Sequence, residues 1–334
     1  MVKMVDVARR AGVSVSTVSH VINGTRFVKD ETVQLVRKAI QETGYTHNTI
    51  ARSLVTQSTQ SIGLAISAIS NVYFADLVGT IEAAARRAGY TLLLTDSHDD
   101  ADEELRAVRA LHQRRVDGVL FAPVTGPDGA ALSYLEELGV PTVLVDRCPS
   151  DRFDQVGVEN VEATTGLVEH LVSIGHTRIG MVAGLPGLST SSERVAGYRL
   201  GLERSGVPYD KGLVADGHSN AVSAEAATRE LLRTPDPPTA LVSANNHMTI
   251  GVMRALHLLG IRVPHDLGLV VFDDFEWAGL FHPRLTAVAQ PIREIGDGAV
   301  RMLLDRIRDP RRPPHTERLA TTFNHRDSCG CTPA

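Results

Sequence analysis

The sequence predicts an α/β protein in which a small helical module precedes two lobes of doubly wound parallel sheet, and three observations lead to this fold class. Aromatic residues make up only 4% of the 334-residue chain, so its cores must be built mostly from Val, Leu, Ile and Ala, as in parallel strands covered by helices. From residue 60 onward, short apolar runs alternate with amphipathic stretches. This part of the chain is longer than a single hydrophobic core usually accommodates, which favours two lobes over one.

Seven apolar runs predict strands. They are IGLAI (62–66), TLLL (91–94), GVLFA (118–122), TVLV (142–145), RIGMV (178–182), TALVS (239–243) and GLVVF (268–272). Strands that alternate with helices imply parallel sheets joined by right-handed crossovers. The prolines of residues 309–314 exclude a helix there and predict a solvated loop.

The first sixty residues predict three short helices. Apolar stripes recur at helical spacing over residues 5–11, 18–22 and 33–40. Ser14 is placed to cap the second helix, and Gly44 stands where the residue after the third helix belongs. The first two helices are joined by a three-residue turn that contains glycine, which is the pattern of a helix-turn-helix unit.

Charge distinguishes this module from the rest of the chain. Residues 1–60 hold eight Lys/Arg against four Asp/Glu, a net charge of +4, whereas the whole chain carries −5. A basic end on an acidic body suggests that the small module meets a polyanion such as DNA. A chance local excess is the alternative explanation.

Composition also indicates a compartment. The three cysteines, Cys148, Cys329 and Cys331, are too few and too unevenly placed for a disulfide framework, so we expect reduced thiols in a cytoplasmic protein. The N-terminus reaches charged residues before an apolar signal segment could form, and no stretch is long and apolar enough for a membrane span. We expect neither export nor a membrane partner.

The second helix has the side chains of a DNA-reading helix. Val15 suits a thymine methyl group, Ser16 suits a base edge, and His20 lies one turn beyond Ser16 on the same face. Thr17 points elsewhere and suits a phosphate. The alternative is that these are ordinary exposed helix residues, because helix-turn-helix hairpins also occur without DNA.

An ordered series of motifs resembles the lactose/galactose repressor (LacI/GalR) family of bacterial transcription factors, with an N-terminus most similar to its purine repressor branch. The motifs are DVARRAGVSVSTVSHVINGTRFV, ETGY, ARSLVTQSTQSIG, RVDGVLFAP, GHTRIG, RVAGY, GIRVPHDLGLVVFDD and LTAVAQP. The resemblance implies a helix-turn-helix headpiece at 1–47 and a hinge helix and linker at 48–60. It also implies a two-lobed domain at 61–334, similar to periplasmic sugar-binding proteins, with lobe crossovers near 160, 291 and 321.

The resemblance also assigns DNA contacts and an assembly. Base-reading positions fall on Val15, Ser16 and His20, and a further DNA contact falls on Arg26. Two residues of the hinge are assigned as well: Leu54 matches an apolar wedge that enters the minor groove, and Ala51 is small enough for two hinge helices to approach. The implied assembly is a homodimer or tetramer on a pseudo-palindromic operator.

Two lysines depart from the family pattern in this module. Lys3 and Lys29 stand where the family usually has a capping hydroxyl residue. Since lysine cannot accept a backbone N–H, each lost cap costs about 1 kcal/mol. The alternative for the third helix is that Asp30 caps it instead.

Ligand contacts are expected where strands end, since crevices between parallel sheets bind ligands there. The resemblance places them on Asp146, Thr190, Arg194, Asn246, Asp273 and Gln290, with Phe74 as an apolar wall and His218 as a floor. All of the six except Arg194 and Gln290 clearly follow predicted strand runs. The alternative for each acid is a helix cap or a loop carboxylate.

The expected small-molecule effector is a sugar or sugar derivative. Two cleft positions of the purine repressor are not reproduced, because its arginine falls on Leu188 and its stacking phenylalanine on His218. The acid, amide and guanidinium groups that remain suit pairs of sugar hydroxyls. A solute-binding protein of the same fold is the alternative, although such a protein needs a signal peptide and has no headpiece.

No enzyme and no cofactor is expected. The sequence contains no GxSxG, HExxH, P-loop or GxGxxG motif. His325, Cys329 and Cys331 lack both a fourth ligand and the usual zinc spacing. The sequence therefore predicts no metal site.

Overall fold

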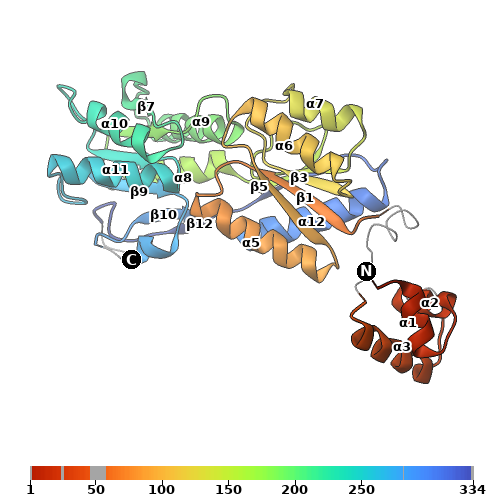
Figure 1. Ribbon diagram of the computed structural model, residues 1–334. Helices are drawn as coiled ribbons and strands as arrows, with labels where there is room; N and C mark the ends of the chain where they lie inside the picture. Colours follow the sequence, from red (N-terminus) through yellow and green to blue (C-terminus); the bar gives the residue numbers. More distant parts are fainter. Residues whose placement is uncertain (1, 24–25, 46–57, 281, 332–334) are drawn as a thin grey trace. The chain divides into compact units, whose positions relative to one another are not determined.

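The computed structural model describes residues 2–23, 26–45, 58–280 and 282–331. The chain divides into two compact units, Met1–Thr59 and Gln60–Ala334. The N-terminal unit is helical and the larger unit is α/β (Figure 1). Within the described residues no helix is both long and apolar enough to cross a bilayer.

The N-terminal unit contains three helices, α1 (Met4–Ala11), α2 (Val15–Asn23) and α3 (Asp30–Thr43). They enclose a small core of Val7, Ala8, Val18, Val36 and Ala39. This is the three-helix arrangement that the apolar stripes predict.

The predicted helix ends of this unit are confirmed. The Thr17 backbone N–H donates to Ser14 Oγ at 3.1 Å, which caps the start of α2. Gly44 follows α3 with φ +65°, a left-handed conformation that glycine adopts without strain. Lys29 precedes α3 and its side chain makes no capping hydrogen bond.

The first lobe is a six-stranded sheet in the order β11-β5-β4-β3-β1-β2, and every neighbouring pair is parallel. Its strands are β1 (Ser61–Ile66), β2 (Thr91–Asp96), β3 (Gly118–Phe121), β4 (Thr142–Val145), β5 (Asp154–Val158) and β11 (Thr316–Leu319). Its helices are α5 (Val72–Arg87), α6 (Ala101–Gln113), α7 (Ala130–Glu137) and α12 (Ile292–Arg308).

The second lobe repeats this architecture in the order β12-β10-β9-β8-β6-β7, with only β12 antiparallel to its neighbour. Its strands are β6 (Ile179–Ala183), β7 (Val214–Asp216), β8 (Ala240–Ser243), β9 (Gly268–Phe272), β10 (Thr286–Ala289) and β12 (Thr322–Asn324). Its helices are α8 (Asn160–Ser173), α9 (Ser189–Arg204), α10 (Ala221–Leu231), α11 (Asn246–Leu259), η1 (Lys211–Leu213) and η2 (Glu276–Gly279).

The chain passes between the lobes three times. It crosses after β5, returns after β10 through α12, which packs against α5 (Figure 1), and crosses again between β11 and β12. Every residue of β3, β4, β5, β6, β8 and β9 is buried, which explains the continuous apolar runs of the sequence. The predicted fold class, a helical module followed along the chain by two doubly wound sheets, is confirmed.

Candidate functional site

Two aspartates hold equivalent places in the two lobes. Asp146 directly follows β4 of the first lobe and Asp273 directly follows β9 of the second. Both are almost fully buried, and both have a positive φ, +66° and +74°. A non-glycine residue in this conformation costs on the order of 1 kcal/mol or more, and such strain concentrates at functional sites.

The aspartates line a cavity to which both lobes contribute. Six of the predicted ligand contacts line it: Phe74, Asp146, Thr190, Arg194, Asp273 and Gln290. Its volume is about 40 Å³, and since one water needs roughly 10–15 Å³, the cavity has room for only a few waters. The cavity is therefore narrow in this structure.

Arg194 of α9 is held in one orientation. Its Nε donates to Asn160 Oδ1 at 2.9 Å and its Nη1 donates to the Ala244 carbonyl at 2.7 Å. The guanidinium carbon lies 3.7 Å from the centroid of the Phe272 ring. Such a fixed planar fork suits two neighbouring acceptor oxygens of a ligand.

Asp146 lies in a buried network of the first lobe. The Tyr73 hydroxyl donates to Asp146 Oδ1 at 2.7 Å, and the adjacent Arg147 donates through Nη1 to Asp99 Oδ1 at 2.8 Å. Burial raises the pKa of Asp146, although the charges of Arg147 and Arg194 oppose the shift. Burial and the nearby Asp146 carboxylate raise the pKa of Tyr73 well above its usual value, so Tyr73 remains a proton donor.

Asp273 collects donors from the second lobe. Gln290 Nε2 donates to Asp273 Oδ1 at 2.6 Å, and the Asn246 backbone N–H donates to Oδ2 at 3.2 Å. Gln290 Oε1 is buried and has no hydrogen-bond partner within the described residues. A buried acceptor without a partner costs about 1–3 kcal/mol of stability. A ligand hydroxyl that donates to Oε1 would remove this cost.

A hydrogen bond joins the two lobes beside the cavity. Asn246 Nδ2, at the start of α11 in the second lobe, donates to Asn71 Oδ1 at 2.7 Å. Asn71 belongs to the first lobe, where the same oxygen caps α5 by accepting the Tyr73 N–H. This contact therefore links the start of α11 to the start of α5.

Two predicted contacts, Asn246 and His218, are not among the residues that line the cavity. Asn246 lies next to it, where its backbone N–H donates to Asp273. His218 follows β7, is exposed and lines a surface groove beside α10, whereas its neighbour Ser219 lines the cavity. Sequence reasoning did not select Asn71, Tyr73 or Arg147. Their signal was position: Asn71 and Tyr73 lie in the segment after the first predicted strand, and Arg147 directly follows Asp146.

Of the predicted DNA-contacting residues, those that the structure describes lie in α2 or shortly after it. Val15 and Ser16 are exposed, while Thr17 and His20 are half-buried. The hydroxyls of Ser16 and Thr17 each lie 2.8 Å from Ser14 Oγ. Arg26 is exposed beyond the end of α2, and Ala51 and Leu54 lie outside the described residues.

Family models match both parts of the chain. The model of bacterial regulatory proteins of the lacI family matches residues 3–48, and the model of periplasmic binding protein-like domains matches residues 168–329. Together they cover the helical unit and most of the second lobe.

Individual proteins are similar over nearly the whole length. The HTH-type transcriptional repressor PurR of Pectobacterium carotovorum subsp. carotovorum (strain PC1) is 34% identical over 330 residues, which covers 98% of this chain and 97% of PurR. Among solved structures, the Lac repressor dimer bound to operator and the anti-inducer ONPF is 28% identical with a TM-score of 0.89, covering 98% of this chain and 99% of the other.

A third similar protein was solved with a sugar. The complex of the transcriptional regulator CelR with cellobiose is 32% identical with a TM-score of 0.75, and the match covers 98% of this chain and all of the other. The relatives are transcriptional repressors and regulators, not enzymes. This chain therefore belongs to the lacI family of bacterial regulatory proteins, as a DNA-binding transcriptional repressor with a ligand-binding domain.

Proposed function

We propose that the protein represses transcription from a pseudo-palindromic operator under the control of a carbohydrate effector, which binds in the cleft between the two lobes. The observation that carries this proposal is the composition of the cavity. It combines two buried carboxylates, Asp146 and Asp273, with the fixed Arg194 fork and the unpaired Oε1 of Gln290. Sugar hydroxyls both donate and accept, so a polyol satisfies all of these groups at once.

The class of effector has support beyond the cavity. Similar regulators have been solved with cellobiose and with the anti-inducer ONPF. A purine base is the second candidate, because the PurR repressors are similar over almost the whole chain. The cavity argues for the sugar, since the buried, apolar Leu188 lines it where the purine repressor branch has an arginine.

Control requires that the effector distinguish two states of the two-lobed domain. A ligand moves a conformational equilibrium only by its differential affinity for the two states. The closed state brings Asp146 and Asp273 to one cavity and forms the bond between Asn246 and Asn71. A ligand that touches both lobes therefore binds the closed state more tightly than the open one.

The DNA-binding part of the proposal concerns the headpiece (1–47) and the hinge and linker (48–60), with the two-lobed domain at 61–334. We assign base reading to Val15, Ser16 and His20. Further roles fall on four residues: Thr17 and Arg26 as supporting DNA contacts, Leu54 as the wedge, and Ala51 at the contact between two hinge helices. Because one small module reads few bases, the protein acts as a homodimer or tetramer, and as a DNA-binding regulator it works in the cytoplasm.

A thermal-shift screen tests the effector class. Full-length protein is heated with a panel of mono- and disaccharides, nucleosides and purine bases, since a ligand that binds only the native state must raise the melting temperature. We expect a sugar to do so. If only purine bases raise the melting temperature, the effector is a purine base and not a carbohydrate.

Selection on random duplexes tests the DNA-binding proposal separately. The expected product is an enriched site with two-fold symmetry, and its binding should weaken steeply with salt because phosphate contacts release counterions. Enrichment of an asymmetric site, or of none, would contradict the proposal.

A further inference from the structure

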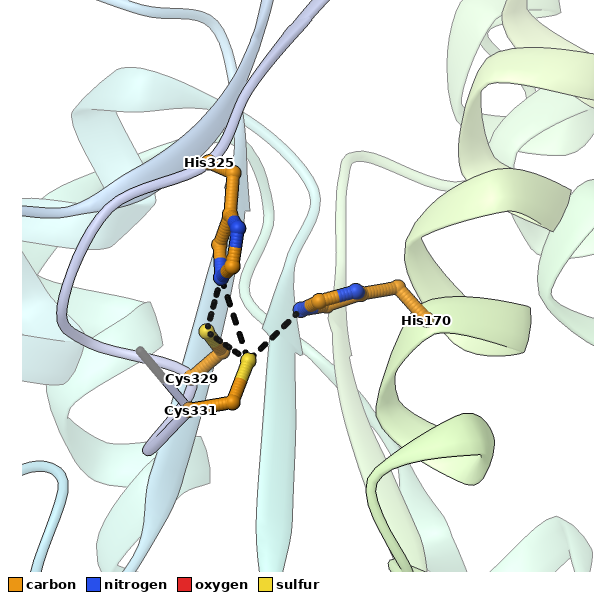
Figure 2. Close-up of side chains that lie close together, drawn as sticks. All are labelled: His170, His325, Cys329 and Cys331. Atoms are coloured by element: carbon orange, nitrogen blue, oxygen red, sulfur yellow. Dashed lines mark hydrogen bonds between the residues drawn. The ribbon is translucent and has the colours of Figure 1, made fainter. Parts of the chain in front are cut away.

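Four side chains with metal-binding atoms meet in the second lobe, and none of them lines the effector cavity. They are His170 of α8, His325 after β12, and Cys329 and Cys331 of the C-terminal segment (Figure 2). Their ligand atoms all lie within 4.8 Å of one another. The sequence alone offered only three of these ligands, because His170 lies more than 150 residues before the other histidine.

The distances within the cluster are those of ligands around one ion. The two Sγ atoms are 3.3 Å apart, His325 Nε2 lies 3.1 Å from Cys331 Sγ and 3.3 Å from Cys329 Sγ, and His170 Nε2 lies 3.7 Å from Cys331 Sγ. Zn–S bonds of about 2.3 Å and Zn–N bonds of about 2.0–2.1 Å give ligand separations of roughly 3.3–3.8 Å in a tetrahedron. Of the observed separations, 3.7 Å lies within this range and those of 3.1 and 3.3 Å lie at or below its short end, so an ion would have to move the ligands apart by a few tenths of an ångström.

The C-terminal segment is anchored directly before the first of the two thiols. Asp327 pairs with Arg284 through two hydrogen bonds of 2.8 Å. The buried Ser328 hydroxyl donates to the Leu269 carbonyl at 2.6 Å and accepts the Thr286 N–H at 2.8 Å. Gly330 has φ +93°, which permits the tight turn that points both cysteines the same way. These ligands are therefore held in place before any ion arrives.

Anchoring also applies to the individual ligands. Thr286 Oγ1 donates to Cys329 Sγ at 3.4 Å, and the His170 and His325 rings make an edge-to-face contact with centroids 4.9 Å apart. The exposed Phe323 packs against both histidine rings. Cys329 is buried, whereas the other three ligands are partly exposed, so an ion can enter from solvent.

We propose that His170, His325, Cys329 and Cys331 form a binding site for a thiophilic divalent transition metal ion, with Zn²⁺ as the preferred occupant. Two thiolates and two imidazoles are a ligand set that tetrahedral zinc prefers, whereas magnesium and calcium require oxygen ligands. All four ligands come from the protein, so the ion has no open position for a reacting water. The site is structural: it ties α8 to the C-terminal segment within the second lobe.

Metal titration of the full-length protein tests this site. Protein that has been reduced and stripped with a chelator is titrated with Zn²⁺ against a chromophoric chelator, and with Co²⁺ under absorption spectroscopy. We expect one ion per chain, a thiolate-to-cobalt charge-transfer band and the intense visible bands of tetrahedral cobalt. Zn²⁺ should also raise the melting temperature, because the unfolded chain does not hold the ligands together.

Single substitutions identify the ligands. His170→Gln and Cys331→Ser remove partly exposed ligands, and each should weaken zinc binding by more than the roughly 10- to 100-fold that loss of an outer partner costs. His257→Gln is the matched control, since it changes an exposed histidine on α11 of the same lobe. The control should bind zinc as tightly as the parent.

Alkylation of the unsubstituted protein gives an answer that does not depend on how the variants fold. Zn²⁺ should protect Cys329 and Cys331 from iodoacetamide, read by mass spectrometry, while Cys148, whose burial raises its pKa to about 12, should stay unlabelled with and without zinc. The proposal is overturned by a protein that binds no zinc or by zinc-independent labelling of the two thiols. Unchanged affinity in the His170→Gln variant would overturn it equally.

Discussion

Replacing Asp273 by asparagine should make the repressor need roughly 10- to 100-fold more effector. The carboxylate accepts the Gln290 amide at 2.6 Å and the Asn246 N–H at 3.2 Å. Asparagine keeps the shape of the side chain but replaces one acceptor oxygen by an NH₂ group. That NH₂ group would either face another donor or fail to accept a hydrogen bond from a ligand hydroxyl. One hydrogen bond to a charged group accounts for about 1.5–3 kcal/mol, and each 1.4 kcal/mol is tenfold in affinity.

The assay compares two binding constants for each variant. Calorimetry gives the affinity for the sugar found in the screen, and fluorescence anisotropy gives the affinity of the ligand-free protein for the operator. Asp236→Asn is the control, because this aspartate is 79% exposed and its ion pair with Arg178 is worth little. Parental effector affinity in Asp273→Asn would show that Asp273 is only a loop carboxylate and that the assigned cavity is wrong.

Three further substitutions test the headpiece and hinge. Leu54→Ala should lower operator affinity and reduce DNA bending, while effector binding stays unchanged. Undiminished bending in a permutation gel would show that Leu54 is not the wedge. His20→Ala should change the preferred bases in a selection, whereas equal weakening on all duplexes would make its role positional. Lys29→Ser should supply the side-chain cap that α3 lacks, a gain of about 1 kcal/mol that slows amide exchange in the headpiece about fivefold. Unaltered amide exchange would show that a missing side-chain cap does not destabilise the start of α3.

Much of the fold was predictable because the strands are buried on both faces. Runs such as TVLV and GLVVF stand out in the sequence, and the structure places β4 and β9 there. The strands that escaped prediction are short or mixed in composition. β5 reads DQVGV, and although all five residues are buried, Asp154 is held by an ion pair with Arg306 at 2.9 Å. No local sequence pattern around Asp154 indicates that its partner is Arg306, which lies far away in the sequence.

The candidate site was predictable to the extent that it depends on strand ends. Asp146 and Asp273 follow apolar runs directly, so their meeting at the sheet edges could be anticipated. Arg194 lies on a helix, and only the family resemblance indicated it. The cluster of two histidines and two cysteines shows the limit most clearly, because His170 reaches Cys331 through the packing of α8 against the second sheet. Sequence spacing carries no record of that contact.

The most direct test of ligand-controlled repression is an anisotropy titration of the selected operator duplex with full-length protein, carried out with and without saturating sugar. If the effector shifts the population of the closed state, operator affinity should change by about tenfold or more, since allosteric coupling is typically worth about 1–3 kcal/mol. Ionic strength must be the same in both arms because it alone changes the affinity. Equal operator affinities with and without a sugar that demonstrably binds the protein would contradict the account.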